Sequence, residues 1–505
     1  MNTLRMLAVT LAVVIVVVIG GSVFATCQTW QPLTNQPTFS PGTMLLLTDG
    51  TVLAHSEPNC LSCTSTDYSS WYKLAPDVNG SYVNGTWSKV AAPTGYAPLY
   101  FASAVLPDGR VIAEGGEYDC SSGTCNAAWI TQGAIYDPVK NVWASVAPPS
   151  GWTTIGDAQS VILPSGTYMQ ANCCTKDEAL LNPTNLTWTP TGTGKFDIHD
   201  EEGWTLLPSG KVLTVDAYVF QYDASGTNSE IYTPSTGSWA SAGSTIQQLW
   251  DSCGGSTAAS YEVGPAILRP DGTVFATGAN TCGPGHTAIY NSNTGTWTAG
   301  PDFPAAYGSA DGPAALEPSG NVLVFSSPSR FYPPAGQFFE WNGTSLTLIA
   351  PPASAVEDAS YVGHLLILPT GQIMFTDFST NVEVLTPAGT YNPAWAPTIS
   401  SVSGSLTRGK TYTVYGTQFN GLSQGSAYGD DFQNATNYPI VRIVNAATGH
   451  VFYCRTHYHS TMGIATGNKK VSTQFDVPSG AEPGESQIFV IANGIPSSPF
   501  WIKVK

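Results

Sequence analysis

The sequence predicts an all-β protein, a seven-bladed β-propeller followed by a C-terminal immunoglobulin-like β-sandwich. Composition, an internal repeat and a change of pattern near the C-terminus support this prediction. Only 10% of the 505 residues are charged, whereas 11% are aromatic and the chain contains 51 Gly and 37 Pro. Such a mixture is poor in helix formers and rich in the residues of strands and tight turns. It therefore favours many short strands joined by turns.

The repeat has two parts. The first is a pair of apolar runs joined by a tight turn such as Pro-Asp-Gly or Pro-Ser-Gly, and the second ends in Trp after a turn. Together they make four strands with a period of about fifty residues, which is typical of propeller blades. Seven copies predict seven blades in a domain spanning 26–395, and Trp30 is expected to lie on an outer strand that closes the ring. The first part occurs at 45–55, 104–116, 161–172, 205–216, 266–278, 314–325 and 365–377, and the second ends at Trp143, Trp188, Trp239 and Trp297 among others.

Both ends of the chain depart from the repeat. Residues 396–505 carry a different set of strands, enough for a small β-sandwich. Residues 1–25 contain Arg5 and then a long apolar run that ends in small residues before Thr26. This pattern predicts a secretory signal peptide and a secreted or extracytoplasmic protein. The alternative is an uncleaved anchor, because the run is long enough to span a bilayer.

The net charge of the chain limits the classes of partner that it is expected to bind. The net charge is −17, and cleavage after residue 25 would make it one unit more negative, because only Arg5 is lost. An acidic surface repels phosphate backbones and anionic lipids, so we expect neither nucleic acid nor a membrane as a partner, apart from the N-terminal segment. An extracellular carbohydrate or small polyol fits better, and we expect a monomer.

The ten cysteines agree with export and predict disulfides between near neighbours. Two adjacent cysteines are candidates for a vicinal disulfide, and two others have no partner that the sequence identifies. The predicted pairs are Cys60–Cys63, Cys120–Cys125, Cys253–Cys282 and the vicinal Cys173–Cys174, with Cys27 and Cys454 left over.

One repeated position, seven residues before the turn proline or its equivalent, is polar in four of the seven units. Inner strands of a propeller begin near its central channel, so these residues are expected to converge there. Asp157, Glu201 and Asp311 would then form a polar axial pocket that binds a ligand. Carboxylates in such a pocket suit Ca²⁺ or Mn²⁺, or act as acid and base on a glycoside; the alternative is hydrogen bonding to backbone and channel water. The full set is Pro41, Tyr100, Asp157, Glu201, Val263, Asp311 and Val362.

Two histidines alternate in the C-terminal region, in the stretch RTHYHSTMG at 455–463. Residues two apart on a strand face the same side, so His457 and His459 are both predicted to reach the axis. At the axis they could both act as metal ligands. The alternative is that they are hydrogen-bonded strand residues that hold no metal.

A propeller followed by a β-sandwich, with the stretches YFASAVLPDGRVIAEGGEY at 100–118 and YVGHLLILPTGQIMF at 361–375, resembles the galactose oxidase/glyoxal oxidase family of copper-radical enzymes. The resemblance covers nearly all of the chain after the signal segment. It implies an axial copper held by two tyrosines and two histidines, with one tyrosine joined to a cysteine. Such a site oxidises an alcohol or aldehyde and reduces O₂ to H₂O₂.

The resemblance assigns roles to several residues and fails at two positions. Tyr100 matches the cysteine-linked tyrosine and Tyr361 the axial tyrosine. His457, in a Thr-His pair, matches the C-terminal ligand, and Tyr118 takes the place of the aromatic shield. However, Val362 stands where the family has a histidine, and Ser40 stands where it has the cysteine.

The first hypothesis is therefore a secreted galactose-oxidase-like protein that binds a carbohydrate or polyol at its axis, with an incomplete copper-radical site. Its predicted ligand-binding residues are Asp157, Glu201, Asp311 and Tyr118. The second is an active oxidase that uses copper, with Tyr100 and Tyr361 as catalytic residues and with Tyr100, Tyr361, His457 and His459 as metal ligands. The third is a structural surface module.

Overall fold

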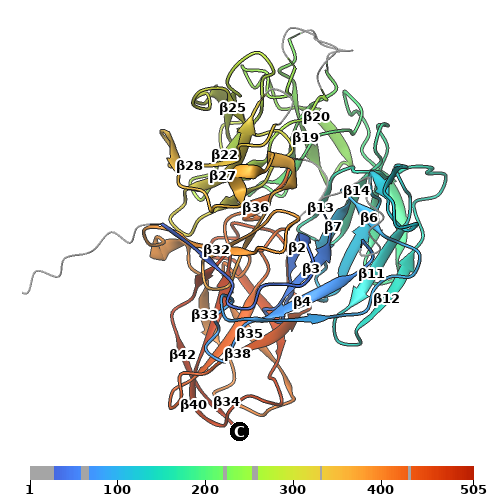
Figure 1. Ribbon diagram of the computed structural model, residues 1–505. Coiled ribbons are helices and arrows are strands. Elements are labelled where there is room, and N and C mark those ends of the chain that lie inside the picture. The colour runs from blue at the N-terminus through green and yellow to red at the C-terminus, as the bar shows by residue number, and fades with distance from the viewer. Residues whose placement is uncertain (1–27, 59–67, 220–224, 253–259, 330–332, 430–433) are drawn as a thin grey trace, which may run out of the picture.

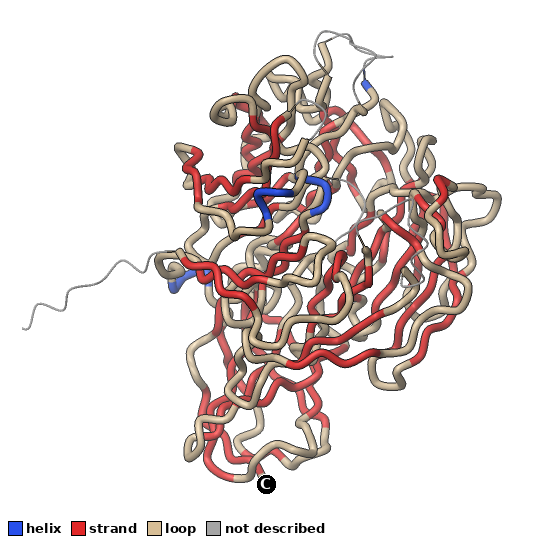
Figure 2. Tube along the Cα trace, in the orientation of Figure 1, coloured by secondary structure: helices blue, strands red, loops and turns tan. Residues whose placement is uncertain are grey.

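The computed structural model describes residues 28–58, 68–219, 225–252, 260–329, 333–429 and 434–505. Antiparallel strands dominate it, and its helical segments are single turns such as η2 (Ala355–Glu357), η3 (Ser360–Val362) and η4 (Pro393–Trp395) (Figure 2). Together with the similarity reported below, this confirms the predicted all-β propeller fold. The predicted signal segment at 1–25 lies outside the described residues. In the described part of the chain, no helix is long and apolar enough to cross a bilayer.

Sheets of four sequential strands follow one another along the chain (Figure 1). In each, the innermost strand begins at or shortly after the repeated position identified above, and the next strand returns after the tight turn. The first four sheets are β2 (Pro41–Leu46), β3 (Val52–Ser56), β4 (Trp71–Ala75) and β5 (Thr86–Lys89); β7 (Ala102–Val105), β8 (Val111–Glu114), β11 (Gly133–Asp137) and β12 (Val142–Val146); β13 (Ser160–Ile162), β14 (Tyr168–Ala171), β15 (Glu178–Asn182) and β16 (Thr187–Thr191); and β17 (Trp204–Leu206), β18 (Val212–Val215), β19 (Ser229–Thr233) and β20 (Ser238–Ser241).

The last sheet is completed by the start of the chain. Its outermost strand is β1 (Thr29–Pro32), which pairs antiparallel with β32 (Glu383–Thr386) so that Trp30 lies opposite Leu385. The N-terminal segment thus closes the ring as the position of Trp30 predicts. The remaining sheets of the ring are β21 (Ala266–Leu268), β22 (Thr273–Thr277), β23 (Thr287–Asn291) and β24 (Thr296–Ala299); β26 (Ala314–Leu316), β27 (Val322–Pro328), β28 (Gln337–Trp341) and β29 (Leu346–Ile349), with β25 (Tyr307–Gly308) beside β27; and β30 (His364–Ile367), β31 (Ile373–Thr376), β32 (Glu383–Thr386) and β1 (Thr29–Pro32). A further small sheet has the order β10 (Asn126–Ala127), β9 (Tyr118–Asp119) and β6 (Pro98–Leu99).

The innermost strands contact one another in a closed circle. In order they are β2, β7, β13, β17, β21, β26 and β30, and β30 contacts β2 again. Several of the repeated tryptophans join their sheet to the one before it. The indole N–H of Trp143 donates to the Ala91 carbonyl at 2.8 Å, and its ring packs on Trp71 at 4.9 Å. Trp188 likewise donates to the Ala147 carbonyl at 2.7 Å. These contacts explain why the repeat keeps a Trp near the end of each unit.

The C-terminal strands form a separate sheet system below the propeller in the view of Figure 1. Val414, Ile443 and Phe475 are among the residues of its own buried core. The order is β33 (Thr398–Ser401), β35 (Thr411–Thr417), β39 (Lys470–Asp476), β38 (Val451–His457), β37 (Ile440–Asn445), β40 (Gly484–Ala492), β42 (Phe500–Val504) and β34 (Ser405–Leu406), with β41 (Ile495–Pro496) beside β40.

One C-terminal segment leaves this system and enters the propeller. Strand β36 (Ser426–Ala427) pairs with the inner strand β26 and lies among the propeller strands in Figure 1. Gln424 accepts a hydrogen bond from the backbone N–H of Leu206 at 2.7 Å, and the carbonyl of Gly425 accepts one from Leu316 at 2.7 Å. The segment therefore satisfies backbone groups of two inner strands and fills the channel between them.

The cysteines agree with the predictions in part. Cys120 and Cys125 form a disulfide, and Cys282 is disulfide-bonded. Cys173 and Cys174 are free thiols, so the predicted vicinal disulfide is wrong. Both thiols instead donate hydrogen bonds to Asp200, at 3.5 and 3.6 Å. Cys454 is a buried free thiol, whereas Cys27, Cys60, Cys63 and Cys253 lie outside the described residues.

Candidate functional site: an acidic, tyrosine-lined pocket at the propeller axis

A pocket of about 320 Å³ opens where the inner strands begin. Its walls come from the residues just before β7, β13, β17, β21, β26 and β30 and from Glu117 and Tyr118 at β9 (Tyr118–Asp119), so it surrounds the axis of the ring. Tyr428, from the segment that enters the channel, also contributes. The lining residues are Tyr100, Glu117, Tyr118, Asp157, Glu201, Ser260, Glu262, Asp311, Tyr361 and Tyr428.

The backbone directs three of these side chains in the same way. Tyr100, Glu201 and Asp311 occupy the same position in their repeats and have φ angles of 50°, 56° and 45°. A left-handed conformation costs a non-glycine residue roughly 1–2 kcal/mol and tends to occur at functional sites. One unusual conformation at three equivalent positions indicates that each chain turn is built to present a side chain to the axis.

The carboxylates form two overlapping groups. Asp157, Asp200 and Glu201 place carboxylate oxygens within 4.8 Å of one another, and so do Glu201, Glu262 and Asp311. Glu201 belongs to both groups. In the part of the chain that the structure describes, no Lys, Arg or His lines the pocket.

The electrostatics of the pocket favour protonated carboxyl groups. Burial and the nearby Asp157 and Asp311 raise the pKa of Glu117 to about 8. Burial also raises the pKa of Asp311 to about 7, with Asp157 adding to the shift. Burial and Glu117 raise the pKa of the Tyr118 phenol to about 12. Carboxylates that lack a positive neighbour hold protons in this way until a cation or a hydrogen-bonding ligand compensates their charge.

The structure brings together the six propeller residues that the sequence singles out, namely Tyr100, Tyr118, Asp157, Glu201, Asp311 and Tyr361. The rings of Tyr100 and Tyr118 lie 6.1 Å apart, edge to face.

The two C-terminal histidines are not part of this pocket, so their predicted place at the site is wrong. His457 lies at the end of β38, where its Nε2 is 3.1 Å from Asp476, and His459 contacts the Thr473 hydroxyl at 2.8 Å. The backbone N–H of the intervening Tyr458 donates to the carbonyl of Pro107 at 2.8 Å. Pro107 lies at the far end of β7 from Tyr100, seven residues of extended chain or roughly 20 Å away. The histidines therefore dock on the opposite end of the propeller.

The donors in the pocket do not fit the copper site that the resemblance implies. Copper(II) in that arrangement needs imidazole nitrogens beside tyrosine oxygens, and the pocket offers only phenol, hydroxyl and carboxyl oxygens. His364, two residues after Val362, is buried at 3.8 Å from Glu57 and stacks behind the Tyr428 ring at 5.7 Å, so it does not line the pocket. Tyr100 packs near Tyr118 and Phe378, and Ser40 supplies no sulfur for a thioether.

Sequence reasoning missed four lining residues: Glu117, Ser260, Glu262 and Tyr428. Glu262 directly precedes Val263, which occupies the repeated axial position, so a search one residue to either side would have found it. Tyr428 stands in the polar and aromatic stretch that begins at 428, but nothing local indicates that this stretch enters the channel. Its neighbours Asp430 and Asp431, which are candidates for a cation loop, lie outside the described residues.

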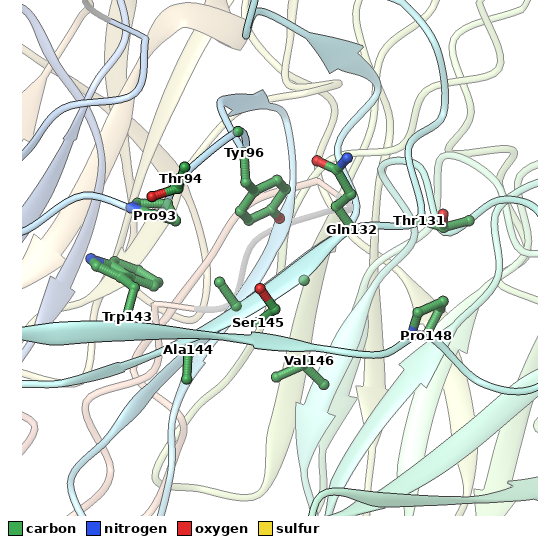
Figure 3. Close-up of a pocket in the computed structure, with 13 residues that line it drawn as sticks. Pro93, Thr94, Tyr96, Thr131, Gln132, Trp143, Ala144, Ser145, Val146 and Pro148 are labelled. Carbon is green, nitrogen blue, oxygen red and sulfur yellow. The ribbon is translucent and has the colours of Figure 1, made fainter.

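A second pocket, of about 340 Å³, lies against β11 and β12. Figure 3 shows Tyr96, Gln132 and Trp143 among the residues around it. None of its lining residues is charged. It lacks the convergent ionisable groups of the axial pocket, so it is the weaker candidate for a functional site.

Comparison with known proteins supports the fold. No family model and no curated protein matches the sequence. Among solved structures, a fungal alcohol oxidase of the AA5 family, in complex with copper, is similar over 94% of this chain and 99% of its own. Its TM-score is 0.53 and its sequence identity 16%, so the likeness shows the propeller fold alone. A catalytically inactive virginiamycin B lyase from Staphylococcus aureus, with quinupristin, covers 71% of this chain and 99% of its own, with 11% identity and a TM-score of 0.46.

Proposed function

We propose that the axial pocket binds a neutral carbohydrate or other small polyol outside the cytoplasm. The observation that carries the proposal is the convergence of tyrosine rings and carboxylates in a single pocket of about 320 Å³. That volume falls in the range of small-ligand sites.

The chemistry of the walls suits many hydroxyl groups. Carboxyl and carboxylate oxygens of Asp157, Glu201 and Asp311 accept hydrogen bonds from hydroxyls, and charge-assisted bonds of this kind are the stronger ones. The rings of Tyr100, Tyr118 and Tyr361 offer apolar faces for the C–H groups of a polyol, while their phenols exchange hydrogen bonds with its hydroxyls. An anionic ligand would be repelled by the same walls.

The direct test is calorimetric titration of the purified protein with a panel of neutral mono- and oligosaccharides and sugar alcohols. At least one is expected to bind, with affinity lost at least tenfold in Asp157→Asn and in Tyr118→Ala. The matched control is Asp137→Asn, because Asp137, at the end of β11, pairs with the exposed Lys140 at the protein surface. Failure of the whole panel, or equal weakening by the control, would overturn the proposal.

The fold likeness to a copper alcohol oxidase makes oxidation the second candidate. It is tested by loading the protein with copper and measuring H₂O₂ release on the same panel. Because the donor set lacks nitrogen, we expect no release above the copper-only control.

A further inference from the structure

We propose that Glu201, Glu262 and Asp311 form a binding site for a hard divalent cation of the Ca²⁺ class. This proposal goes beyond carbohydrate binding, because it concerns a metal ion whose binding can be measured on the protein without a sugar. Each residue contributes one carboxylate oxygen, and the three oxygens lie within 4.8 Å of one another. Ca²⁺ binds oxygens at 2.3–2.6 Å, so oxygens about twice that far apart, or closer, can surround one ion.

The independent observation is a buried oxygen that lacks a partner. Glu262 is 9% exposed, and its Oε2 atom has no hydrogen-bond partner among the described residues. Within the same part of the chain, Asp311 Oδ1 is likewise buried without a partner. A buried carboxylate oxygen left unpaired is costly, so native proteins normally pair it with a donor or a metal. Both oxygens belong to residues of the same group.

A second cluster of three carboxylates shows how negative charge of this kind is compensated elsewhere in the protein. Asp197, Glu202 and Asp216 also lie within 4.8 Å of one another, and all are buried. There the ammonium of Lys195 contacts Asp197 and lies 3.2 Å from Glu202 and 3.3 Å from Asp216. The carboxylates of the axial group are as close together, and among the described residues no Lys, Arg or His lines their pocket. A bound cation would take the role that Lys195 performs in the other group.

The neighbouring group of Asp157, Asp200 and Glu201 is less suited to a hard cation. Both oxygens of Asp200 already accept hydrogen bonds, from the thiols of Cys173 and Cys174. Soft sulfur donors at that end favour other metals, whereas the Glu262 end offers oxygens alone. We therefore assign the ion to Glu201, Glu262 and Asp311.

The test is terbium luminescence on the full chain, since Tb³⁺ substitutes for Ca²⁺ and is sensitised by nearby tyrosines such as Tyr100 and Tyr428. Titration in the absence of sugar is expected to give saturable emission that Ca²⁺ displaces. Glu262→Gln should weaken Tb³⁺ binding at least tenfold. Glu117→Gln, which makes the same substitution in the same pocket but outside the group, should weaken it less than threefold.

Three results would overturn the site: no saturable emission, equal loss in both variants, or emission unchanged in Glu262→Gln. Circular dichroism of each variant shows whether it folds, and Glu262→Asp, which keeps the carboxylate, should retain more affinity than Glu262→Gln in a folded protein. Sugar titrations repeated with EDTA separate this inference from the proposed function, because each ligand is then measured without the other.

Discussion

The hydroxyl of Tyr428 donates a hydrogen bond of 2.6 Å to the backbone carbonyl of Tyr361. The donor belongs to the C-terminal segment inside the channel, and the acceptor lies just before β30, on the pocket wall. The bond therefore joins the two parts of the chain at the candidate site. Tyr428 is almost fully buried and is also one of the residues that line the pocket.

Tyr428→Phe should remove this bond and keep the ring. A buried hydrogen bond contributes about 1 kcal/mol, and the carbonyl left without its donor adds to the loss. We expect the free energy of unfolding, measured by urea denaturation, to fall by about 1–2 kcal/mol. Polyol affinity should weaken severalfold as Tyr361 loses its support. Tyr458→Phe is the control, since Tyr458 is 66% exposed, and a comparable loss there would refute this role for the bond.

Lys195→Met should be among the most destabilising substitutions in the propeller. Lys195 is buried, and its ammonium lies 2.9 Å from Glu230 in addition to its contacts with the three carboxylates described above. Removing one partner of a buried ionic group leaves uncompensated charge and costs roughly 3–5 kcal/mol. Lys140→Met, which removes an exposed partner of Asp137, should change stability by less than about 0.5 kcal/mol. Thermal and chemical unfolding of the two variants provide the comparison, and similar losses would contradict the buried network.

Glu117 should make the folded protein less stable as the pH rises. Its folded pKa is about 8, above the ordinary value of 4.5, so the folded state keeps a proton that the unfolded chain releases. This contribution is complete below pH 4.5 and is lost as the pH rises through 8. In EDTA, wild type should lose more stability than Glu117→Gln between pH 5 and 9, by roughly 2 kcal/mol after allowance for partial exposure. Parallel pH profiles of the two proteins would show that Glu117 is ionised at neutral pH.

Replacing the C-terminal histidines should leave the pocket unaffected. His457→Ala and His459→Ala break contacts to Asp476 and Thr473, roughly 20 Å from Tyr100 along β7. Sugar and terbium affinities are expected to stay within twofold of wild type, with a modest loss of stability from the lost hydrogen bonds. A large drop in either affinity, in protein that unfolds normally, would place the histidines back at the site.

The repeat made most of the candidate site predictable. Asp157, Glu201 and Asp311 could be placed together because a propeller converts one position in a sequence repeat into one position around an axis. Tyr100 followed from the same spacing, whereas Tyr361 came from the resemblance to the copper-radical family. The left-handed backbone at Tyr100, Glu201 and Asp311 leaves no mark in the residue types, so it could not be foreseen.

The C-terminal contribution was not predictable in this way. The alternation of His457 and His459 gives the side of a strand that they occupy, but not the end of the propeller against which that strand packs. The Thr456 N–H bonds the carbonyl of Thr48 at 3.1 Å, at the turn that follows β2, and this contact holds the histidines away from the pocket.

By itself, the sequence determined the all-β propeller and the convergence of acidic and tyrosine side chains, because periodic burial and turn chemistry are local properties that recur in each unit. Only the tertiary structure decided that Tyr428 reaches the axis and that Glu262 and Asp311 meet without a buried lysine. Those outcomes depend on how a non-repeating segment fills the channel and satisfies the backbone groups of strands distant in sequence.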